Sequence, residues 1–208
     1  MKSIGYRFVE LFLVFVLAPI SMVLDISIRA KMAIVAIGFL YILVVILGVE
    51  RIKIHVKRHI EWKRFWKLTL IKFIGIVVIT ALYILVFQPE SLFNPIVKDY
   101  RVWLLFCCVY TFLSVYPQEL IYRTFFFQRY QSLFKNENLF ILVNAALFSL
   151  AHLFFKNTLV MVLTFVGGIL FALTFTKTKS TLLVSIEHAL YGCWLFSVGM
   201  GEMLGFPL

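Results

Sequence analysis

Long, almost uninterrupted apolar stretches constrain the fold of this chain more than any other feature of its sequence. About seven stretches have the length of a membrane span, near residues 6–24, 31–49, 68–88, 102–122, 138–155, 158–176 and 180–200. Because lipid offers no partners for backbone N–H and C=O groups, each stretch must satisfy its own backbone as a helix. The sequence therefore predicts an all-α, polytopic membrane bundle of about seven to eight transmembrane helices.

The composition of the chain excludes a soluble domain. Its 208 residues are 62% hydrophobic and only 14% charged, whereas soluble domains average roughly 45–50% apolar and about 25% charged residues. The alternating pattern of a membrane β-barrel is not found either. The stretch from 102 to 135 is too long for one simple span and contains Pro117, so the sequence leaves seven and eight helices open.

Lysine and arginine positions predict the orientation. Most of them fall on the side of the membrane that the N-terminus shares, and the positive-inside rule assigns that side to the cytoplasm. We expect a multi-pass protein of the cell membrane with a cytoplasmic N-terminus. The densest basic run, RIKIHVKRHIEWKRFWK (residues 51–67), also holds apolar and aromatic residues. It suits a helix on an anionic lipid surface rather than a nucleic-acid site.

Charged and polar side chains are distributed unevenly over the predicted spans. A charge at the bilayer centre costs about 2.5–3.5 kcal/mol on insertion scales, so such residues usually face a partner or a wet cavity. Apart from Arg7 and Lys31 at the outermost positions of their spans, the first three spans carry only Glu10 and Lys72, each near a predicted end. The second half carries Glu119, Arg123, His152, Glu187 and His188. We therefore expect anchoring helices over residues 1–101 and catalytic helices around a polar intramembrane cavity over residues 102–208.

Glu119 and Arg123 are four residues apart, which on an α-helix places them on one face where they can form an ion pair. Pro117 just before them fits a helix start or a kink. The pair can be purely structural, or it can hold a carboxylate in position for chemistry. The pair alone does not decide between these two interpretations.

His152 and His188 each lie in an apolar stretch, where a single histidine is more often a hydrogen-bonded core residue than a catalyst. Together with Glu119 they provide the groups that activate water: a carboxylate base and two imidazoles that stabilise an oxyanion or bind a divalent metal such as zinc. Glu187, next to His188, points about 100° away around the helix and is expected to orient another polar group.

Two other features predict packing rather than chemistry. Val166, Gly167 and Gly168 resemble a phosphate loop only superficially, because no Lys-Ser or Lys-Thr follows, so we expect close helix contact there. The three cysteines, at 107, 108 and 193, have no metal-type spacing and are expected to be small packing residues.

Three polar segments, taken in order, resemble the CPBP family of CAAX prenyl endopeptidases and bacterial Abi-type intramembrane proteases. The family pattern is Glu-Glu-x-x-x-Arg, then Phe-x-x-x-His, then His-x-x-x-Asn or Asp. This sequence has Gln-Glu-Leu-Ile-Tyr-Arg at 118–123, Phe-Ser-Leu-Ala-His at 148–152 and His-Ala-Leu-Tyr-Gly at 188–192. The resemblance extends over about residues 102–200, and its strength comes from the order of the three motifs.

The resemblance implies a helical bundle with a cavity open to the cytosol, in which a peptide or protein substrate is cleaved by activated water. Members are often labelled metalloproteases, although a metal-free mechanism is also argued. Carried onto this sequence, Glu119 is the base, His152 lies beside it on the water or metal, and His188 stabilises the oxyanion. Gln118 orients the water and Arg123 fixes Glu119. Any metal would be held by His152, His188 and Glu119.

Two positions depart from the family pattern. Gln118 replaces the first glutamate, and an amide cannot accept a proton from water. Gly192 replaces the final Asn or Asp and has no side chain to donate a hydrogen bond, although Tyr191 could donate instead. These departures keep open a catalytically weak or inactive relative that binds membrane peptides or proteins as a scaffold. A proton-relaying transporter is disfavoured, because no inverted repeat is found.

The depths of the motif residues present a further difficulty. With the spans given above, Glu119 lies near the cytoplasmic end of its helix and His152 lies nearer the outer end, too far apart to share a water. A break at Pro117, followed by a deep helix through Tyr130, would bring Glu119 to the level of both histidines. The sequence analysis therefore predicts such a break.

Overall fold

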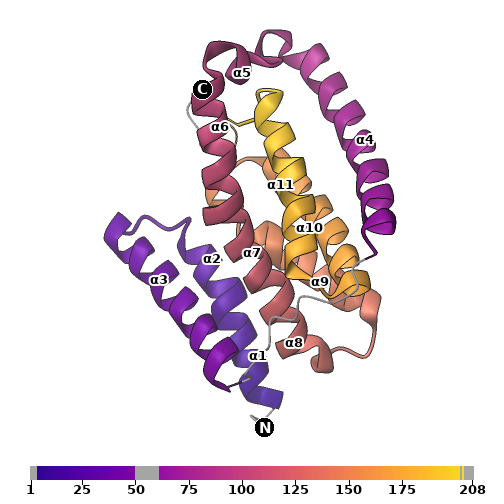
Figure 1. Ribbon diagram of the computed structural model, residues 1–208. Coiled ribbons are helices and arrows are strands. Elements are labelled where there is room, and N and C mark those ends of the chain that lie inside the picture. The colour runs from indigo at the N-terminus through magenta and orange to yellow at the C-terminus, as the bar shows by residue number, and fades with distance from the viewer. Residues whose placement is uncertain (1–3, 50–60, 202, 204–208) are drawn as a thin grey trace. The chain divides into compact units, whose positions relative to one another are not determined.

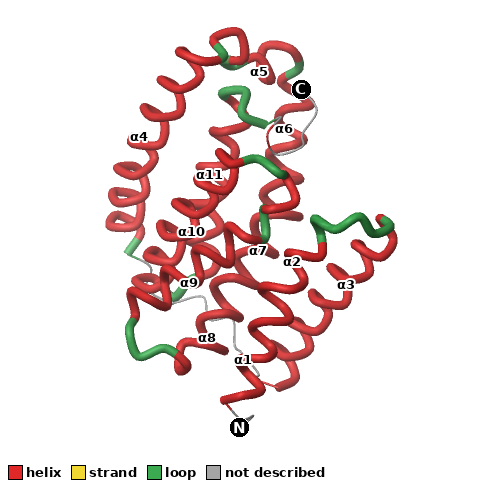
Figure 2. The backbone as a smooth tube through the Cα atoms, turned by 180° about the vertical axis from the view of Figure 1, so that it is seen from behind, coloured by secondary structure: helices red, strands yellow, loops and turns green. Residues whose placement is uncertain are grey.

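The computed structural model describes residues 4–49, 61–201 and 203 of the chain. Within these ranges every regular element is a helix, and Figure 2 shows helices joined by short loops. Six helical segments of the described chain are long and apolar enough to cross a membrane: Ile4–Ser21, Ile28–Gly48, Trp62–Phe87, Tyr100–Leu133, Glu137–Phe155 and Thr158–Thr178. The predicted all-α, polytopic fold class is confirmed, and the chain is a multi-pass membrane protein.

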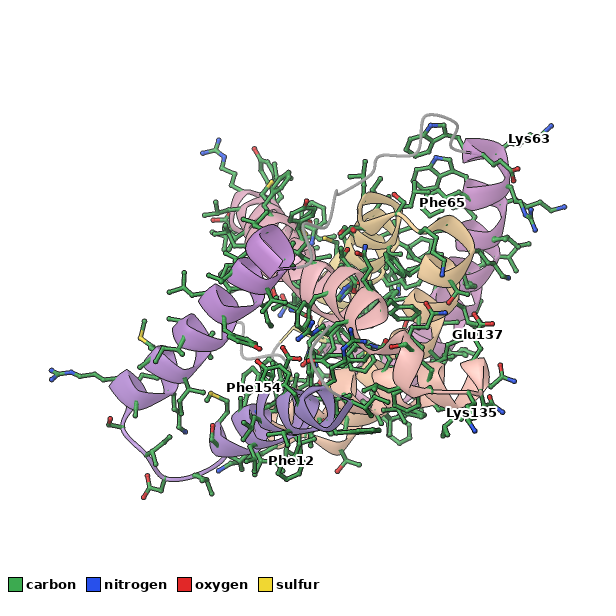
Figure 3. All side chains as sticks on the ribbon, turned by 90° about the horizontal axis from the view of Figure 1, so that it is seen from below. Phe12, Lys63, Phe65, Lys135, Glu137 and Phe154 are labelled. Carbon is green, nitrogen blue, oxygen red and sulfur yellow. The ribbon has the colours of Figure 1, made fainter. Side chains whose placement is uncertain are left out.

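The seventh predicted stretch forms α11 (Thr181–Ser197), an apolar helix of 17 residues. This helix is slightly shorter than the roughly 20 residues of an average span. Most of the basic run, residues 51–60, lies outside the described residues. Its last part opens α4 (Trp62–Phe87), where Lys63 points outward and Phe65 lies on the inner side of the helix (Figure 3).

Residues Tyr100–Leu133 form one helical run of 34 residues. The predicted break at Pro117 is wrong. The run passes through the proline between two π-helical segments, because the Tyr116 N–H bonds to the carbonyl of Thr111, five residues back, and the wider turn accommodates a residue without an N–H. Its segments are α6 (Tyr100–Val109), η4 (Tyr110–Val115), α7 (Tyr116–Glu119), η5 (Leu120–Phe125), α8 (Phe126–Tyr130) and η6 (Gln131–Leu133).

The chain forms two compact units, each of which combines early and late parts of the sequence. Unit 1 contains residues 1–55 and 120–173, and unit 2 contains residues 56–119 and 174–208. The division falls within the long helical run, directly after Glu119. The predicted split into anchoring residues 1–101 and catalytic residues 102–208 concerns function rather than compactness, and it stays a prediction.

Unit 1 is organised around an aromatic core. Phe15 lies at its centre, within 5.1–6.2 Å (ring centroids) of Tyr122, Phe125, Phe126 and Tyr130. Several helices of this unit contact one another, α1 against α8 and η1 against α9 among them. The helices contributed before the division are α1 (Ile4–Phe12), η1 (Leu13–Leu17), α2 (Ala18–Ser21), α3 (Ile28–Val44) and η2 (Val45–Val49). Those after it are η5, α8, η6, α9 (Glu137–Leu150), η7 (Leu153–Phe155) and most of α10 (Thr158–Thr178).

A buried ion pair links the first helix of unit 1 to the later part of the chain. Arg129 on α8 donates from Nε to Glu10 Oε2 of α1 at 2.9 Å, and the two side chains are 1% and 2% exposed. Tyr41 on α3 donates to the same carboxylate. Glu10 was expected near the end of a span, and its pairing explains how an apolar helix can hold a charge there.

Unit 2 is organised around α11, which packs against α4, α5, α6, η4 and α7 (Figure 1). Ser180 caps the start of α11 by accepting from the Leu183 N–H, and Asp99 caps α6. Indole N–H groups add bonds between helices, from Trp103 to Ser197 and from Trp194 to Thr80. The remaining elements before α6 are η3 (Pro89–Ser91) and α5 (Asn94–Lys98).

The predicted role of the Val166–Gly168 stretch in helix packing is confirmed within unit 1. A Cβ placed on Gly168 of α10 would lie 2.9 Å from Ala145 Cα of α9, and real Cβ atoms do not approach backbone so closely. The absence of a side chain therefore allows the two helix backbones to touch, as small residues do in membrane bundles.

We expect Gly168→Ala to lower the free energy of unfolding by about 1–3 kcal/mol, the usual cost of overpacking a tight contact. Gly75→Ala on α4 is the matched control, because no atom lies within 4 Å of its would-be Cβ. That change should be neutral or stabilising by up to about 1 kcal/mol through helix propensity. Thermal unfolding in detergent measures both, and equal stability of the two variants would contradict the close contact.

Candidate functional site

The candidate site lies in unit 2, where α7 packs against α11. Glu119 ends α7, and His188 lies in the middle of α11. The two side chains meet in a hydrogen bond of 2.7 Å between His188 Nδ1 and Glu119 Oε1. Glu119 is fully buried and His188 is 7% exposed. In the tautomer that has its proton on Nδ1, His188 donates this bond and the carboxylate accepts it.

Local backbone geometry helps to place Glu119. The π-helical segments η4 and η5 lie on either side of α7, so the side chains before and after Glu119 do not follow regular α-helical spacing. Single π turns inside α-helices occur frequently at functional sites. One signal of this irregularity is visible in the sequence, namely Pro117 within an otherwise strongly apolar helix.

Gln118 precedes Glu119 on α7. Its amide Nε2 donates to Ser114 Oγ at 2.7 Å, one turn earlier in the same helix. Its Oε1 is buried and has no hydrogen-bond partner among the residues that the structure describes. That oxygen is a hydrogen-bond acceptor on the residue directly before Glu119, and its role of orienting a water molecule stays a prediction.

Gly192, the second departure from the family pattern, is packed against a tyrosine that sequence reasoning missed. A Cβ on Gly192 would overlap the hydroxyl and the ring edge of Tyr110, at the start of η4. The Tyr110 ring lies 6.0 Å from the His188 ring at an angle of 83°. Nothing in the local sequence distinguishes Tyr110 from the other aromatic residues of its span. Only the missing side chain at Gly192 hinted at a partner.

Tyr191, the alternative oxyanion donor, is directed elsewhere in unit 2. Its hydroxyl bonds to Glu187 Oε1 at 2.8 Å and to the Thr69 carbonyl at 3.2 Å. Glu187 also pairs with Lys72 of α4, and Lys72 donates to Thr174 Oγ1 at 2.8 Å. Glu187 thus orients other polar groups, as expected, and the structure identifies them. The sequence did not reveal the partner of Lys72, because 115 residues separate the two.

Arg123 lies in unit 1 and is fully buried. It donates to Asn144 Oδ1 at 2.6 Å and to the Gly168 carbonyl at 3.4 Å, and its guanidinium lies over the Phe148 ring. Asn144 in turn donates to the Tyr122 carbonyl at 2.8 Å. Within its unit, Arg123 therefore orders the contact between the long helical run, α9 and α10.

His152 also lies in unit 1, in a turn after the end of α9 rather than within a helix as the expected span 138–155 implied. Helix α9 ends at Leu150, and the His152 Nδ1 donates to the Phe148 carbonyl at 2.8 Å. A histidine that bonds a last-turn carbonyl stabilises a helix C-terminus. This bond gives the Phe-x-x-x-His spacing a structural role and fixes the orientation of the ring.

The structure thus brings Gln118, Glu119 and His188 into unit 2 and places Arg123 and His152 in unit 1. The predicted Glu119–Arg123 pair and the predicted approach of His152 to Glu119 both join residues of different units, and they stay predictions. Among the described residues, no three His, Cys, Asp or Glu side chains are grouped to hold a metal. The predicted metal site also stays a prediction.

Comparison with known protein families gives a match over the second half of the chain. The family model described as type II CAAX prenyl endopeptidase, Rce1-like, matches residues 100–194. This range includes all three motifs and most of the segment on which the resemblance was based, so the family relationship expected from the sequence is confirmed there. Comparisons with curated proteins and with solved structures gave no match.

We expect Lys72→Met to lower the free energy of unfolding by about 3–5 kcal/mol, because it leaves the buried Glu187 carboxylate without its cation. Lys63→Met, on the exposed first turn of α4, is the matched control and should change stability little. Reversible unfolding in mixed micelles measures both variants. A Lys72→Met protein as stable as the wild type would show that Glu187 does not depend on this pair.

Proposed function

Because residues 100–194 are related to the type II CAAX prenyl endopeptidases, we propose that this chain is an intramembrane endopeptidase. It hydrolyses a peptide bond with water activated by Glu119 and His188. The observation that carries the proposal is the 2.7 Å hydrogen bond between these two buried side chains. They come from the first and third motifs, 69 residues apart in sequence.

The reaction uses the pair in its charged form. Glu119 takes a proton from water, and the resulting hydroxide attacks the peptide carbonyl. His188 bonds to Glu119 through Nδ1–H and, as an imidazolium, has a second donor at Nε2–H for the oxyanion that develops. Glu119 then delivers its proton to the leaving amine, which completes hydrolysis without any other reactant.

Burial increases the effect of each of these groups. Charges and dipoles interact more strongly in a low-dielectric site than in water, and donors already in place need no reorganisation during the reaction. In this proposal Gln118 accepts the second hydrogen of the attacking water through Oε1. Arg123 fixes Glu119 and His152 lies beside the water, as the family resemblance implies.

The substrate is proposed to be a membrane-associated peptide or protein, and the relationship to CAAX prenyl endopeptidases adds a prenyl group as one candidate feature. The distribution of Lys and Arg supports a cytoplasmic N-terminus in the cell membrane, in contact with anionic lipid. A divalent metal such as zinc, held by Glu119, His152 and His188, remains part of the proposal.

A second candidate function is a scaffold that binds membrane peptides or proteins without cleaving them. Gln118 favours it, because its amide donates to Ser114 and cannot take a proton from water. Gly192 favours it as well, since this position contributes no side chain to an oxyanion site. The protease proposal therefore depends on Glu119 as the base.

Cleavage of a peptide library that includes farnesylated cysteine peptides, followed by mass spectrometry, tests the proposal. Wild type should cleave, and Glu119→Gln and His188→Ala should each be slower by at least about 100-fold, as when an oxyanion donor is removed. Glu137→Gln, at the exposed start of α9 (Figure 3), is the matched control and should keep wild-type activity. His152→Ala tests whether His152 acts on the attacking water, and a chelator tests whether a metal takes part.

The outcomes separate the two candidate functions. A Glu119→Gln variant that cleaves at the wild-type rate contradicts the assigned base. A folded wild type that retains library peptides but cleaves none supports the scaffold. Loss of cleavage on adding chelator, with recovery on adding zinc, would bring the metal into the mechanism.

A further inference from the structure

The Tyr110 hydroxyl occupies the space that a side chain at position 192 would fill. A Cβ on Gly192 would overlap the hydroxyl oxygen and two ring atoms of Tyr110. His188 and Gly192 are four residues apart on α11 and share one helix face. The hydroxyl therefore lies about one helical turn from His188, on the face that carries the imidazole.

The surroundings of Tyr110 connect it to the same side-chain pair. Its ring meets the His188 ring edge to face, with the ring centroids 6.0 Å apart, and the Phe196 ring lies 4.8 Å away. Tyr110 and Glu119 belong to one helical run, and both of their segments, η4 and α7, pack against α11. These contacts fix the ring on two sides and leave its orientation well defined.

We propose that Tyr110 is a further catalytic residue, whose hydroxyl donates a hydrogen bond to the substrate carbonyl oxygen beside His188. The inference rests on the proposed function and deepens it, because it identifies the second donor of the oxyanion site. A phenol hydroxyl donates one hydrogen bond, as a side-chain amide at position 192 could. Gly192 lacks the amide donor of the family pattern, and the Tyr110 hydroxyl, on a different helix, supplies a donor in its place.

A purely structural role for Tyr110 makes a different prediction. If the ring only fills space against Gly192 and Phe196, removal of the hydroxyl should matter little, because the ring remains. If the hydroxyl binds the oxyanion, its removal should weaken the transition state far more than the ground state. Tyr110→Phe separates the two roles and keeps the packing. Tyr116→Phe, on the exposed side of the same helical run, is the matched control.

The decisive measurement compares two farnesylated peptides of one sequence, one with the normal amide and one with a phosphinate in place of the scissile bond. The phosphinate is tetrahedral and anionic, like the intermediate. Wild type should bind it more tightly than the amide. Tyr110→Phe should weaken phosphinate binding by roughly 10- to 100-fold, as expected for a hydrogen bond to a charged group, and amide binding by less than about twofold. Tyr116→Phe should match wild type.

Each outcome decides the inference. Unchanged phosphinate binding in Tyr110→Phe overturns it, and so does a wild type that does not prefer the phosphinate. If the wild type cleaves no peptide but prefers the phosphinate peptide, and this preference depends on the Tyr110 hydroxyl, the proposed hydrolysis is refuted. Tyr110 then remains a hydrogen-bond donor to a bound anion. Where cleavage is observed, a fall in kcat without a rise in KM for Tyr110→Phe supports both the proposed hydrolysis and the catalytic role of Tyr110.

A compensation experiment tests the geometry directly. Gly192→Asn alone should destabilise the protein, because its side chain collides with Tyr110. Combined with Tyr110→Ala, the asparagine gains room and offers an amide donor in the vacated space. The double variant should bind the phosphinate peptide about tenfold or more tighter than Tyr110→Ala alone. Equal binding by these two variants would contradict the shared position.

Discussion

Charged side chains inside apolar helices must find partners within the protein, and this constraint organises both units. Each unit contains an ion pair between an early helix and a late one: Glu10 with Arg129 in unit 1, and Lys72 with Glu187 in unit 2. An unpaired charge at membrane depth would cost about 2.5–3.5 kcal/mol or more. These pairs therefore help to specify which helices of the first half associate with which of the second.

The same constraint separates structural polar groups from the candidate catalytic ones. Glu187 and His188 are neighbours on α11, but their side chains diverge around the helix. Glu187 faces α4, where a cation and a tyrosine hydroxyl bond to it. His188 faces α7, where it meets a carboxylate. One helix thus carries a structural ion pair on one side and an acid–base pair on the other.

Much of the fold could be predicted from the sequence, because apolar stretches of span length have one stable form in lipid. The site was only partly predictable. Motif spacing identified Glu119 and His188, and the structure brings them together. The path through Pro117 was not predictable, since it depends on a π turn that no simple pattern encodes. The turn at His152 escaped prediction too, because the residues directly on either side of it, 150–151 and 153–155, are apolar.

The tyrosine at position 110 shows why long-range partners are difficult to find in such chains. With 23 Phe and 9 Tyr, one aromatic residue carries no signal by itself. Its significance comes from Gly192, which lies on another helix and differs from the family pattern. In the same way, Lys72 looked like a charge near a span end until its contact with Glu187 on α11 was visible.

The most direct test of the Glu119–His188 pair is the NMR signal of the His188 Nδ1 proton in ¹⁵N-histidine-labelled protein. The chain has four histidines, so His188→Gln assigns the resonance. A strong bond to a buried carboxylate predicts a far-downfield Nδ1 proton that moves upfield in Glu119→Gln and stays in place in Glu137→Gln. A His188 ring without a proton on Nδ1, or a resonance unchanged by Glu119→Gln, would contradict the pair on which the proposed mechanism depends.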